Sequence, residues 1–261
     1  QQQQQQQRVS LHPQGLVRPR ALSQQQELKQ GQQQTPVSFP GVLPPKDHPP
    51  WLAALLHEVT KRRRLAAFSG KQLVGLLVVL TQAQVQLDQR TTGRLLSTLH
   101  SCITQGCPSL TAHQLSLAMW ALAKTRTSLK AQMMHSLLDR FHEQLPKASI
   151  ADVASLVWAI PLVSKHYTTW LAVQHSSLLH ALADFTLPHL TTCAARGSTS
   201  GQQLCGPRQL VQLAVGFTRL RFYPGAEWMR RHRAASIAVQ HAFTSTDRAQ
   251  IRAAYQALLE V

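Results

Sequence analysis

Apolar residues recur along this chain with the spacing of amphipathic helices. Four of them follow Thr111 at i, i+3, i+4 and i+7, on one face of a helix: Leu115, Ala118, Met119 and Leu122. Thr111 and Gln114 also have the residue types and spacing of a capping box, in which each side chain bonds the backbone N–H of the other residue. The stretch 111–122 therefore predicts a helix that begins after Thr111 and packs through one apolar face.

The same arrangement occurs five times. The expected caps and their partners three residues on are Ser69 and Gln72, Thr111 and Gln114, Ser149 and Asp152, Gly206 and Gln209, and Asp247 and Gln250. The first apolar residues of the five faces are Leu73, Leu115, Val153, Leu210 and Ile251, at spacings of 42, 38, 57 and 41 residues. A period near 40 residues is typical of stacked two-helix units.

A second helix is expected after each of the first four capped helices, at about 90–105, 128–145, 167–188 and 226–243. One more helix is predicted before them, from Asp47 to about Arg64, and the fifth capped helix has no successor before Val261. We therefore expect an all-α fold over residues 47–261, an α-solenoid of about four to five helix-turn-helix repeats with a period of about 38–42 residues. The long interval is assigned to a loop insertion at about 190–205.

Residues 1–46 have a low-complexity composition with glutamine tracts at Gln1–Gln7, Gln24–Gln26 and Gln32–Gln34. They are basic and poor in acids, as organelle transit peptides are, and they contain too little apolar surface to fold alone. We expect a disordered basic arm, either a solvated linker or a segment that orders on a nucleic acid. Because the chain begins with Gln1 rather than Met, we expect it to be processed or partial.

The charge of the chain is strongly positive. It has 27 Lys and Arg residues against 11 Asp and Glu residues, a net charge of +16. This imbalance predicts a polyanionic partner, either a nucleic acid or an acidic membrane surface. No apolar run approaches the roughly 18 residues needed to span a bilayer.

The sequence lacks the residue patterns of an enzyme or a metal protein. The pairs Cys102/Cys107 and Cys193/Cys205 do not have the short paired spacing of a zinc site, and four cysteines without a repeating spacing fit a reducing compartment. There is no nucleophile motif, no glycine-rich phosphate loop and no pair of carboxylates placed for acid–base catalysis. We expect no enzymatic activity, no metal, no cofactor and no small-molecule substrate.

The repeats resemble those of octotricopeptide repeat proteins, which are abundant in green algae and related to the wider FASTK-like helical-repeat RNA binders. The resemblance covers about residues 47–261 and rests on the period and on first helices that read Gln-Leu-x-x-Leu/Ala-x-Trp-Ala-Leu, as at 114–122. Tyr223-Pro-Gly-Ala-Glu-Trp228 looks like a degenerate form of the Pro-Pro-Pro-Glu-Trp signature of that family. Many members end in an RAP domain, but nothing after Asp247 resembles one, so no activity is carried over.

The resemblance implies RNA binding in an organelle, and single residues are candidates for the contact. In helical repeats that read RNA, a few variable polar side chains per repeat face the bases. Such positions here are Lys71, His113, Arg208 and Gln212, with a solvated helix face as the alternative. The recurrent Gln and Asp residues are assigned to capping. Trp120 and Trp158 are assigned to packing between units, with base stacking as the alternative.

Two basic clusters are further candidates, for contact with RNA phosphates. One ends the N-terminal helix: Lys61, Arg62, Arg63 and Arg64. Its alternatives are a solvated helix end and a nuclear-import signal. The other flanks the turn between the helices of the fourth unit: Arg219, Arg221, Arg230, Arg231 and Arg233, with His232 beside them. Several phosphate contacts would make the affinity fall steeply with salt.

Together with the charge and the small size of the chain, the resemblance implies a mitochondrial, structural RNA-binding protein, with the chloroplast as the alternative compartment. Its expected place is the mitochondrial ribosome, where it would bind and stabilise fragmented ribosomal RNA beside other ribonucleoprotein subunits, without a membrane partner. Two other functions stay open. One is a factor for organellar messenger-RNA maturation or translation, and the other is a HEAT-like protein-interaction scaffold that does not contact RNA.

Overall fold

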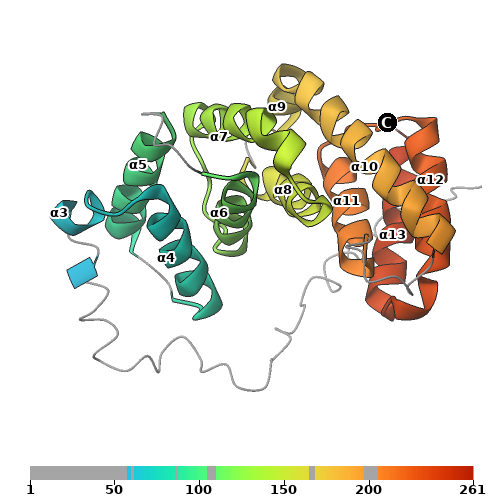
Figure 1. Cartoon of the computed structure of the whole chain (residues 1–261), viewed down its shortest axis with the longest axis horizontal. Coiled ribbons are helices and arrows are strands. Elements are labelled where there is room, and N and C mark those ends of the chain that lie inside the picture. Colours follow the sequence, from blue (N-terminus) through green and yellow to red (C-terminus); the bar gives the residue numbers. More distant parts are fainter. Residues whose placement is uncertain are drawn as a thin grey trace, which may run out of the picture. The chain divides into compact units, whose positions relative to one another are not determined.

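The computed structural model describes residues 58–59, 62–85, 88–104, 110–164, 168–196 and 205–260. Within these ranges every regular element is a helix, so the prediction of an all-α fold is confirmed (Figure 1). The chain divides into two units, Gln1–Val42 and Leu43–Val261, and all described helices belong to the second. The predicted basic arm at 1–46 lies outside the described residues.

The helices follow the predicted pairs closely. They are α3 (Arg62–Leu65), α4 (Gly70–Gln82), α5 (Gln89–Thr104), α6 (Ala112–Lys124), α7 (Ala131–Gln144), α8 (Ile150–Val163), α9 (Thr168–Gln174), α10 (Ser176–Arg196), α11 (Pro207–Arg219), α12 (Ala226–Ala238) and α13 (Ser245–Leu258), with short 3-10 turns at Leu145–Lys147 and Gln240–Ala242. Each capped helix begins within one residue of its predicted start, except α13.

Side-chain caps start the helices where the sequence predicts them. Capping boxes with both reciprocal bonds begin α4 at Ser69, α6 at Thr111 and α8 at Ser149. Each box satisfies two backbone N–H groups that a helix start would leave unpaired, and a cap of this kind contributes about 1 kcal/mol. Helix α11 begins instead after Gly206, with Pro207 at its first position and no side-chain cap.

The start of the fifth capped helix differs from the prediction. Its capping box joins Thr244 and Asp247, so α13 begins at Ser245, three residues before the start expected from Asp247 and Gln250. The Asp247 carboxylate accepts from the Thr244 backbone N–H at 3.0 Å, and the Asp247 N–H donates to the Thr244 hydroxyl at 3.1 Å. With this correction the caps Gly206 and Thr244 are 38 residues apart, the same interval as Thr111 and Ser149.

Three of the capped helices also end in the same way. Gln84, Arg126 and Arg221 have positive φ angles of 53°, 56° and 52°, and each lies fifteen residues after its cap. In each case the next backbone N–H bonds the carbonyl five residues earlier, as from Val85 to Leu80 at 2.9 Å. This is a Schellman turn built without glycine. Helices α4, α6 and α11 thus share a length of 13 residues and the turn that ends them.

The second helix of the third predicted pair departs most from its expected bounds. The predicted helix 167–188 is two helices, α9 and α10, which meet at His175. Helix α10 continues to Arg196, so the expected loop at 190–205 is wrong for residues 190–196, while 197–204 lie outside the described residues. Leu190 and Cys193 are buried in the core, and this burial explains why the helix extends through a Thr-rich stretch.

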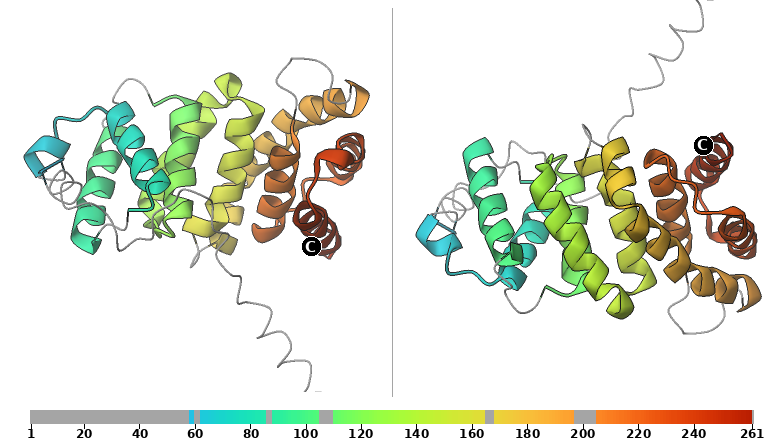
Figure 2. Two further views of the ribbon diagram at one scale, coloured as in Figure 1. Left: turned by 90° about the horizontal axis from the view of Figure 1, so that it is seen from below. Right: turned by 90° about the horizontal axis from the view of Figure 1, so that it is seen from above.

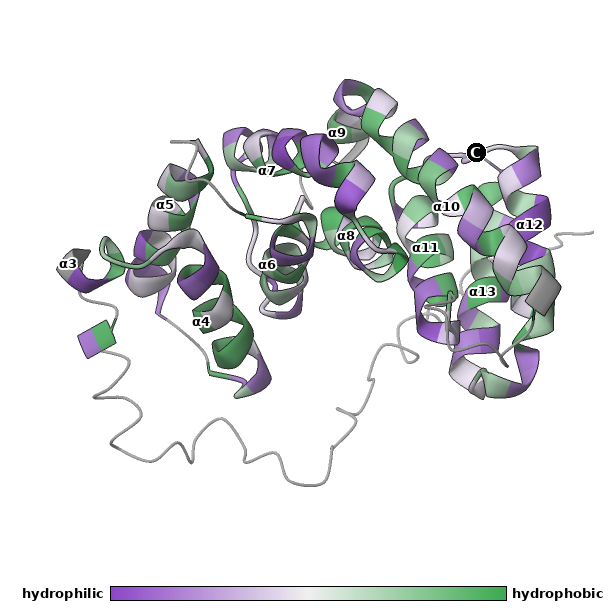
Figure 3. Cartoon of the chain, viewed as in Figure 1, coloured by the Kyte–Doolittle hydropathy of each residue, from purple (hydrophilic) through white to green (hydrophobic). Residues whose placement is uncertain are grey.

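The capped helices pack against one another in chain order, α4 on α6, α6 on α8, α8 on α11 and α11 on α13 (Figure 2). The second helices form another set of contacts, α5 on α7 and α10 on α12. Helices α8 and α11 approach so closely that a Cβ atom on Gly216 would lie 2.6 Å from the backbone oxygen of Val157. Figure 3 shows that α8 is mostly hydrophobic, whereas α12 carries long hydrophilic stretches. The contacts of α8 with α6, α10 and α11 explain this composition.

Candidate nucleic-acid interface

The central capped helices α6, α8 and α11 have one open side. Each contacts a capped helix on either side and a second helix behind it, so three sides are covered. On α6 and α8 the residues two, six, nine and thirteen positions after the N-cap keep partial or full exposure, while most others are buried. Positions with these spacings share one face, because a helix has about 3.6 residues per turn. We call this face, on all five capped helices, the open stripe.

The ends of the open stripe carry cations. Two residues after the caps stand Lys71, His113, Ala151, Arg208 and Thr246. Thirteen residues after the caps stand Gln82, Lys124, Leu162, Arg219 and Ala257. Lys71, Arg208, Lys124 and Arg219 are exposed cations, and the His113 imidazole is exposed as well. A ligand that crosses the stripe would therefore meet positive charge near both ends of the helices.

The middle of the open stripe is aromatic on two adjacent helices. Nine residues after the caps stand Val78, Trp120, Trp158, Val215 and Ala253. Both tryptophans are partly exposed and pack against the core. The Lys124 ammonium of α6 lies 5.4 Å from the ring centroid of Trp158 on α8, within cation–π range. The stripe thus combines flat rings with cations, the two groups that bind bases and phosphates.

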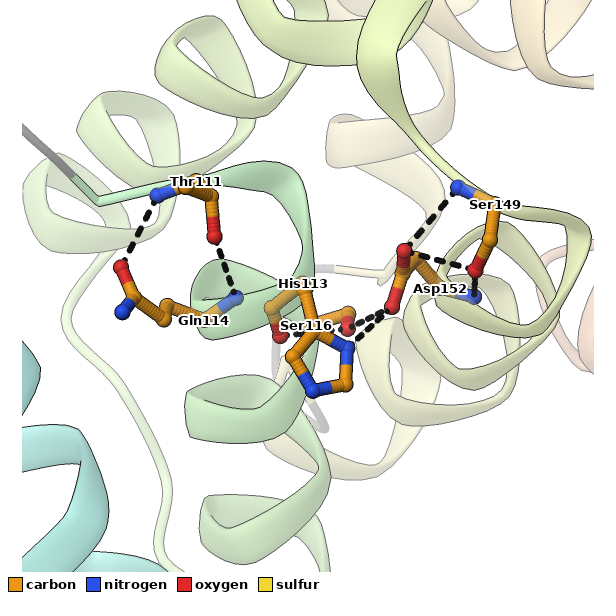
Figure 4. A network of polar contacts seen from close by, with 6 residues as sticks. All are labelled: Thr111, His113, Gln114, Ser116, Ser149 and Asp152. Carbon is orange, nitrogen blue, oxygen red and sulfur yellow. Dashed lines mark hydrogen bonds and ion pairs between the residues drawn. The ribbon is translucent and has the colours of Figure 1, made fainter.

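A polar network ties α6 to α8 at one end of the open stripe (Figure 4). One oxygen of Asp152 accepts from the Ser149 N–H at 3.0 Å as part of the α8 cap. The other accepts from His113 Nδ1 at 2.8 Å and from the Ser116 hydroxyl at 3.1 Å. The Asp152 side chain is 7% exposed, so it holds His113 in place rather than meeting solvent.

The network keeps the Asp152 carboxylate ionised. Burial by itself raises the pKa of Asp152, but hydrogen bonds from Ser149, His113 and Ser116 outweigh it and the pKa is lowered. The His113 side chain remains 67% exposed beyond this bond. His113 is therefore a surface side chain of fixed orientation, at the register of Lys71 and Arg208.

The predicted contact residues of the capped helices differ in their exposure to solvent. Lys71, Arg208 and Arg219 are exposed on the open stripe, and Arg221 is exposed at the end of α11. Gln212 has the stripe register but is only 8% exposed, because α11 is packed between α8 and α13. The Gln212 side chain is thus far less accessible than the other predicted contact residues of the open stripe, and its contact with RNA stays a prediction.

The arginine cluster around the α11–α12 turn is not uniform. Arg230 donates two hydrogen bonds to Glu227, at 2.9 and 2.8 Å, and Arg231 bonds both Glu227 and Thr191. These hydrogen bonds, from Arg230 first and Arg231 second, lower the pKa of Glu227 to about 2. Arg233 is exposed. Phosphates would have to compete with Glu227 for Arg230 and Arg231, but not for the exposed cations of the open stripe.

His232, which lies within that cluster, belongs to the core. It is 0% exposed, stacks on Trp228 and donates from Nε2 to the Leu210 carbonyl at 3.0 Å. Its Nδ1 lies 2.7 Å from the Tyr255 hydroxyl. Because Nε2 carries the proton, neutral His232 accepts from Tyr255. Burial lowers the pKa of His232 to about 4.

The N-terminal basic cluster is described only in part. Lys61 lies outside the described residues, and Arg62 and Arg63 belong to α3, but their side chains are outside the described part. Arg64 is exposed and lies 3.4 Å from the Glu58 carboxylate. This cluster therefore stays a prediction.

The sequence analysis did not identify two exposed cations as candidate contacts: Lys124 on the open stripe, and Arg126 in the turn that follows α6. Lys124 lies thirteen residues after Thr111, as Arg219 does after Gly206, and Arg126 has the left-handed turn position that Arg221 has. Counting from the caps rather than from the apolar face would have identified both. Four cations, Lys124, Arg126, Arg219 and Arg221, thus occupy equivalent places at the ends of α6 and α11.

No cluster of His, Cys, Asp and Glu side chains in the described ranges is arranged to hold a metal ion. None of the described helices has both the length and the apolar character needed to cross a membrane. No protein-family model matches the chain, and no curated protein matches it.

Proposed function

We propose that the repeated helix pairs form an α-solenoid and that this protein binds RNA through the open stripe. The observation that carries the proposal is the recurrence of exposed cations at equivalent positions of α4, α6 and α11, together with tryptophans at one position of the adjacent helices α6 and α8. An exposed positive charge supplies affinity for phosphates, while partly exposed rings accept bases. The net charge of +16 supports the same class of partner.

The protein acts here as a binding component rather than a catalyst. We place it in an organellar ribonucleoprotein, and our first choice is the mitochondrial ribosome. There it would stabilise a segment of ribosomal RNA beside other subunits. This placement rests on the resemblance to octotricopeptide repeat proteins and on the small number of repeats, which contact only a short stretch of RNA. Cosedimentation of the protein with mitochondrial rather than chloroplast ribosomes tests the placement.

The binding itself is tested by fluorescence anisotropy with a labelled, unstructured oligoribonucleotide across a range of salt concentrations. Each phosphate contact contributes a slope of about −0.7 in the logarithm of the affinity against the logarithm of the salt concentration. The triple variant Lys71→Glu, Arg208→Glu, Arg219→Glu reverses three exposed stripe cations and is expected to bind at least about tenfold more weakly, with a shallower slope.

The matched control is Arg90→Glu, Lys147→Glu, Arg248→Glu, which reverses the same number of exposed cations off the open stripe. It is expected to lose much less affinity. A third variant, Arg230→Glu, Arg231→Glu, Arg233→Glu, tests the cluster on α12. Equal losses in the stripe variant and the control would show attraction by net charge alone. Complete absence of RNA binding by the native chain would favour the protein-interaction scaffold.

A further inference from the structure

Trp120 and Trp158 stand at the same height on neighbouring helices. Each lies nine residues after the N-cap of its helix, Thr111 for α6 and Ser149 for α8. These two helices pack directly against each other, and the Asp152 network joins their first turns. The two residues therefore occupy equivalent positions of the open stripe on adjacent helices.

The face of the Trp158 ring is accessible from the surface. Lys124 is an exposed residue, and its ammonium lies over this ring, 5.4 Å from the centroid. A lysine side chain is long and flexible, and its ammonium also binds phosphate as a point charge. A flat ligand can thus replace the ammonium on the ring while Lys124 shifts to an attached phosphate.

Trp120 shows a feature that packing alone does not require. Its indole N–H is buried and has no hydrogen-bond partner within the described residues. An unsatisfied buried N–H costs about 1–3 kcal/mol, and Phe or Leu would fill a packing position without this cost. The ring packs against the core but remains partly exposed, so part of its aromatic surface is open to a ligand.

The surroundings of the two rings suit an anionic strand with unpaired bases. Lys124 and Arg126 stand at the end of α6, both exposed. The one acid of α6 and α8, Asp152, lies in the first turn of α8, is 7% exposed and already accepts four hydrogen bonds. Phosphates therefore meet cations without a facing carboxylate, and bases meet rings.

From this geometry we propose that Trp120 and Trp158 are stacking platforms for two unpaired bases, with Lys124 and Arg126 holding the adjoining phosphates. The inference rests on the proposed function and narrows its ligand to single-stranded RNA. In a duplex the bases stack on each other and their faces are not available to the protein. Stacking on an aromatic side chain is sequence-tolerant, because every base has a flat face.

The test compares Trp120→Leu, Trp158→Leu and the double variant with the native chain, using an unstructured oligoribonucleotide, the same strand with abasic sites, and a duplex RNA. Each leucine variant is expected to weaken single-strand binding about tenfold, and the phenylalanine variants less. Trp170→Leu, at an exposed ring of α9 outside the open stripe, is the matched control and keeps native affinity. Circular dichroism shows which variants fold.

The abasic strand keeps the inference testable if a leucine variant fails to fold. The native chain should bind the abasic strand more weakly than the intact one and quench less tryptophan fluorescence with it. In folded leucine variants this difference should shrink, since the ring that reads the base is gone. Equal native affinity for intact and abasic strands, or a preference for duplex, overturns the inference while RNA binding stands. Absence of any salt-dependent RNA binding removes the proposed function as well.

Discussion

Asp152 joins two helices by accepting a hydrogen bond from His113, 39 residues earlier, at 2.8 Å across the contact between α6 and α8. The same carboxylate closes the capping box of its own helix with Ser149. One side chain thus starts α8 and fixes the position of α6 relative to it. In the other capping boxes that the structure describes, the partner residue is seen to bond its own cap, as Asp247 bonds Thr244.

Replacing Asp152 tests this double role. Asp152→Asn weakens charge-assisted hydrogen bonds from Ser149, Ser116 and His113, and we expect a loss of about 2–3 kcal/mol in the free energy of unfolding. The corresponding change Asp247→Asn touches only its own cap and should cost about 1 kcal/mol. Urea unfolding followed by circular dichroism measures both. Equal losses would show that the link to α6 adds no stability.

The acid dependence of stability should follow from the same group. The pKa of folded Asp152 is lowered, so its contribution is present above the ordinary pKa of 3.8 and is lost as the pH falls through the folded value. The free energy of unfolding of Asp152→Asn should therefore come closer to that of the native chain in strongly acidic solution than it does at neutral pH.

Alanine substitutions at two helical glycines, Gly216 and Gly75, are expected to have opposite effects on stability. At Gly216 the new Cβ would meet the Val157 backbone at 2.6 Å, so α8 and α11 must separate, and we expect a loss of about 2–3 kcal/mol. At Gly75 nothing lies within 4 Å, and alanine should stabilise α4 by about 0.5–1 kcal/mol. Thermal unfolding of Gly216→Ala and Gly75→Ala separates the two. A stable Gly216→Ala would contradict the close packing of these helices.

A glycine should stabilise the protein at the left-handed turn positions that follow the capped helices. Gln84 has a φ of 53°, a left-handed conformation in which a side chain is strained. Gln84→Gly is expected to raise the free energy of unfolding by about 0.5–1 kcal/mol, whereas Gln84→Val should lower it. Chemical unfolding measures both changes. A destabilised glycine variant would show that the turn is not left-handed in solution.

Buried His232 predicts a loss of stability in mild acid. Its pKa falls from 6.5 in the unfolded chain to about 4 in the fold, so the unfolded state binds the proton first. Stability is complete above 6.5 and declines as the pH drops toward about 4, by about 2 kcal/mol at pH ~5. The variant His232→Gln lacks this titratable side chain, so its free energy of unfolding should change less between neutral and mildly acidic pH than that of the native chain. An unchanged pH profile would mean that His232 is solvated or charged in the fold.

The helix starts could be predicted because capping is local chemistry. Ser69, Thr111 and Ser149 each specify a start within four residues, whatever packs around them. The fifth start was misplaced because Arg248 occupies the position where the other helices have their first apolar residue, which moved the pattern to Asp247. The break at His175 and the extension of α10 depend on contacts between distant residues, which periodicity does not contain.

The exposure of a candidate site residue could be predicted where it depends only on the position of that residue along its own helix. Lys71 and Arg208 point off the apolar face and are exposed, whereas Gln212 has the same pattern and is buried by the neighbouring helices. The contact of Lys124 with Trp158 joins α6 to α8, and the sequence of either helix alone does not predict it. The pairing of Arg230 with Glu227, three residues apart on one helix, was readable from spacing.

Ultraviolet crosslinking of the full chain to an unstructured RNA, followed by mass spectrometry of the crosslinked peptides, tests the central claim most directly. We predict crosslinks in the peptides that carry Trp120 and Trp158, and around Lys124 and Arg219, because these residues lie on the open stripe. Crosslinks confined to residues 1–64 or to α12, with none on α6, α8 or α11, would contradict RNA binding by the open stripe.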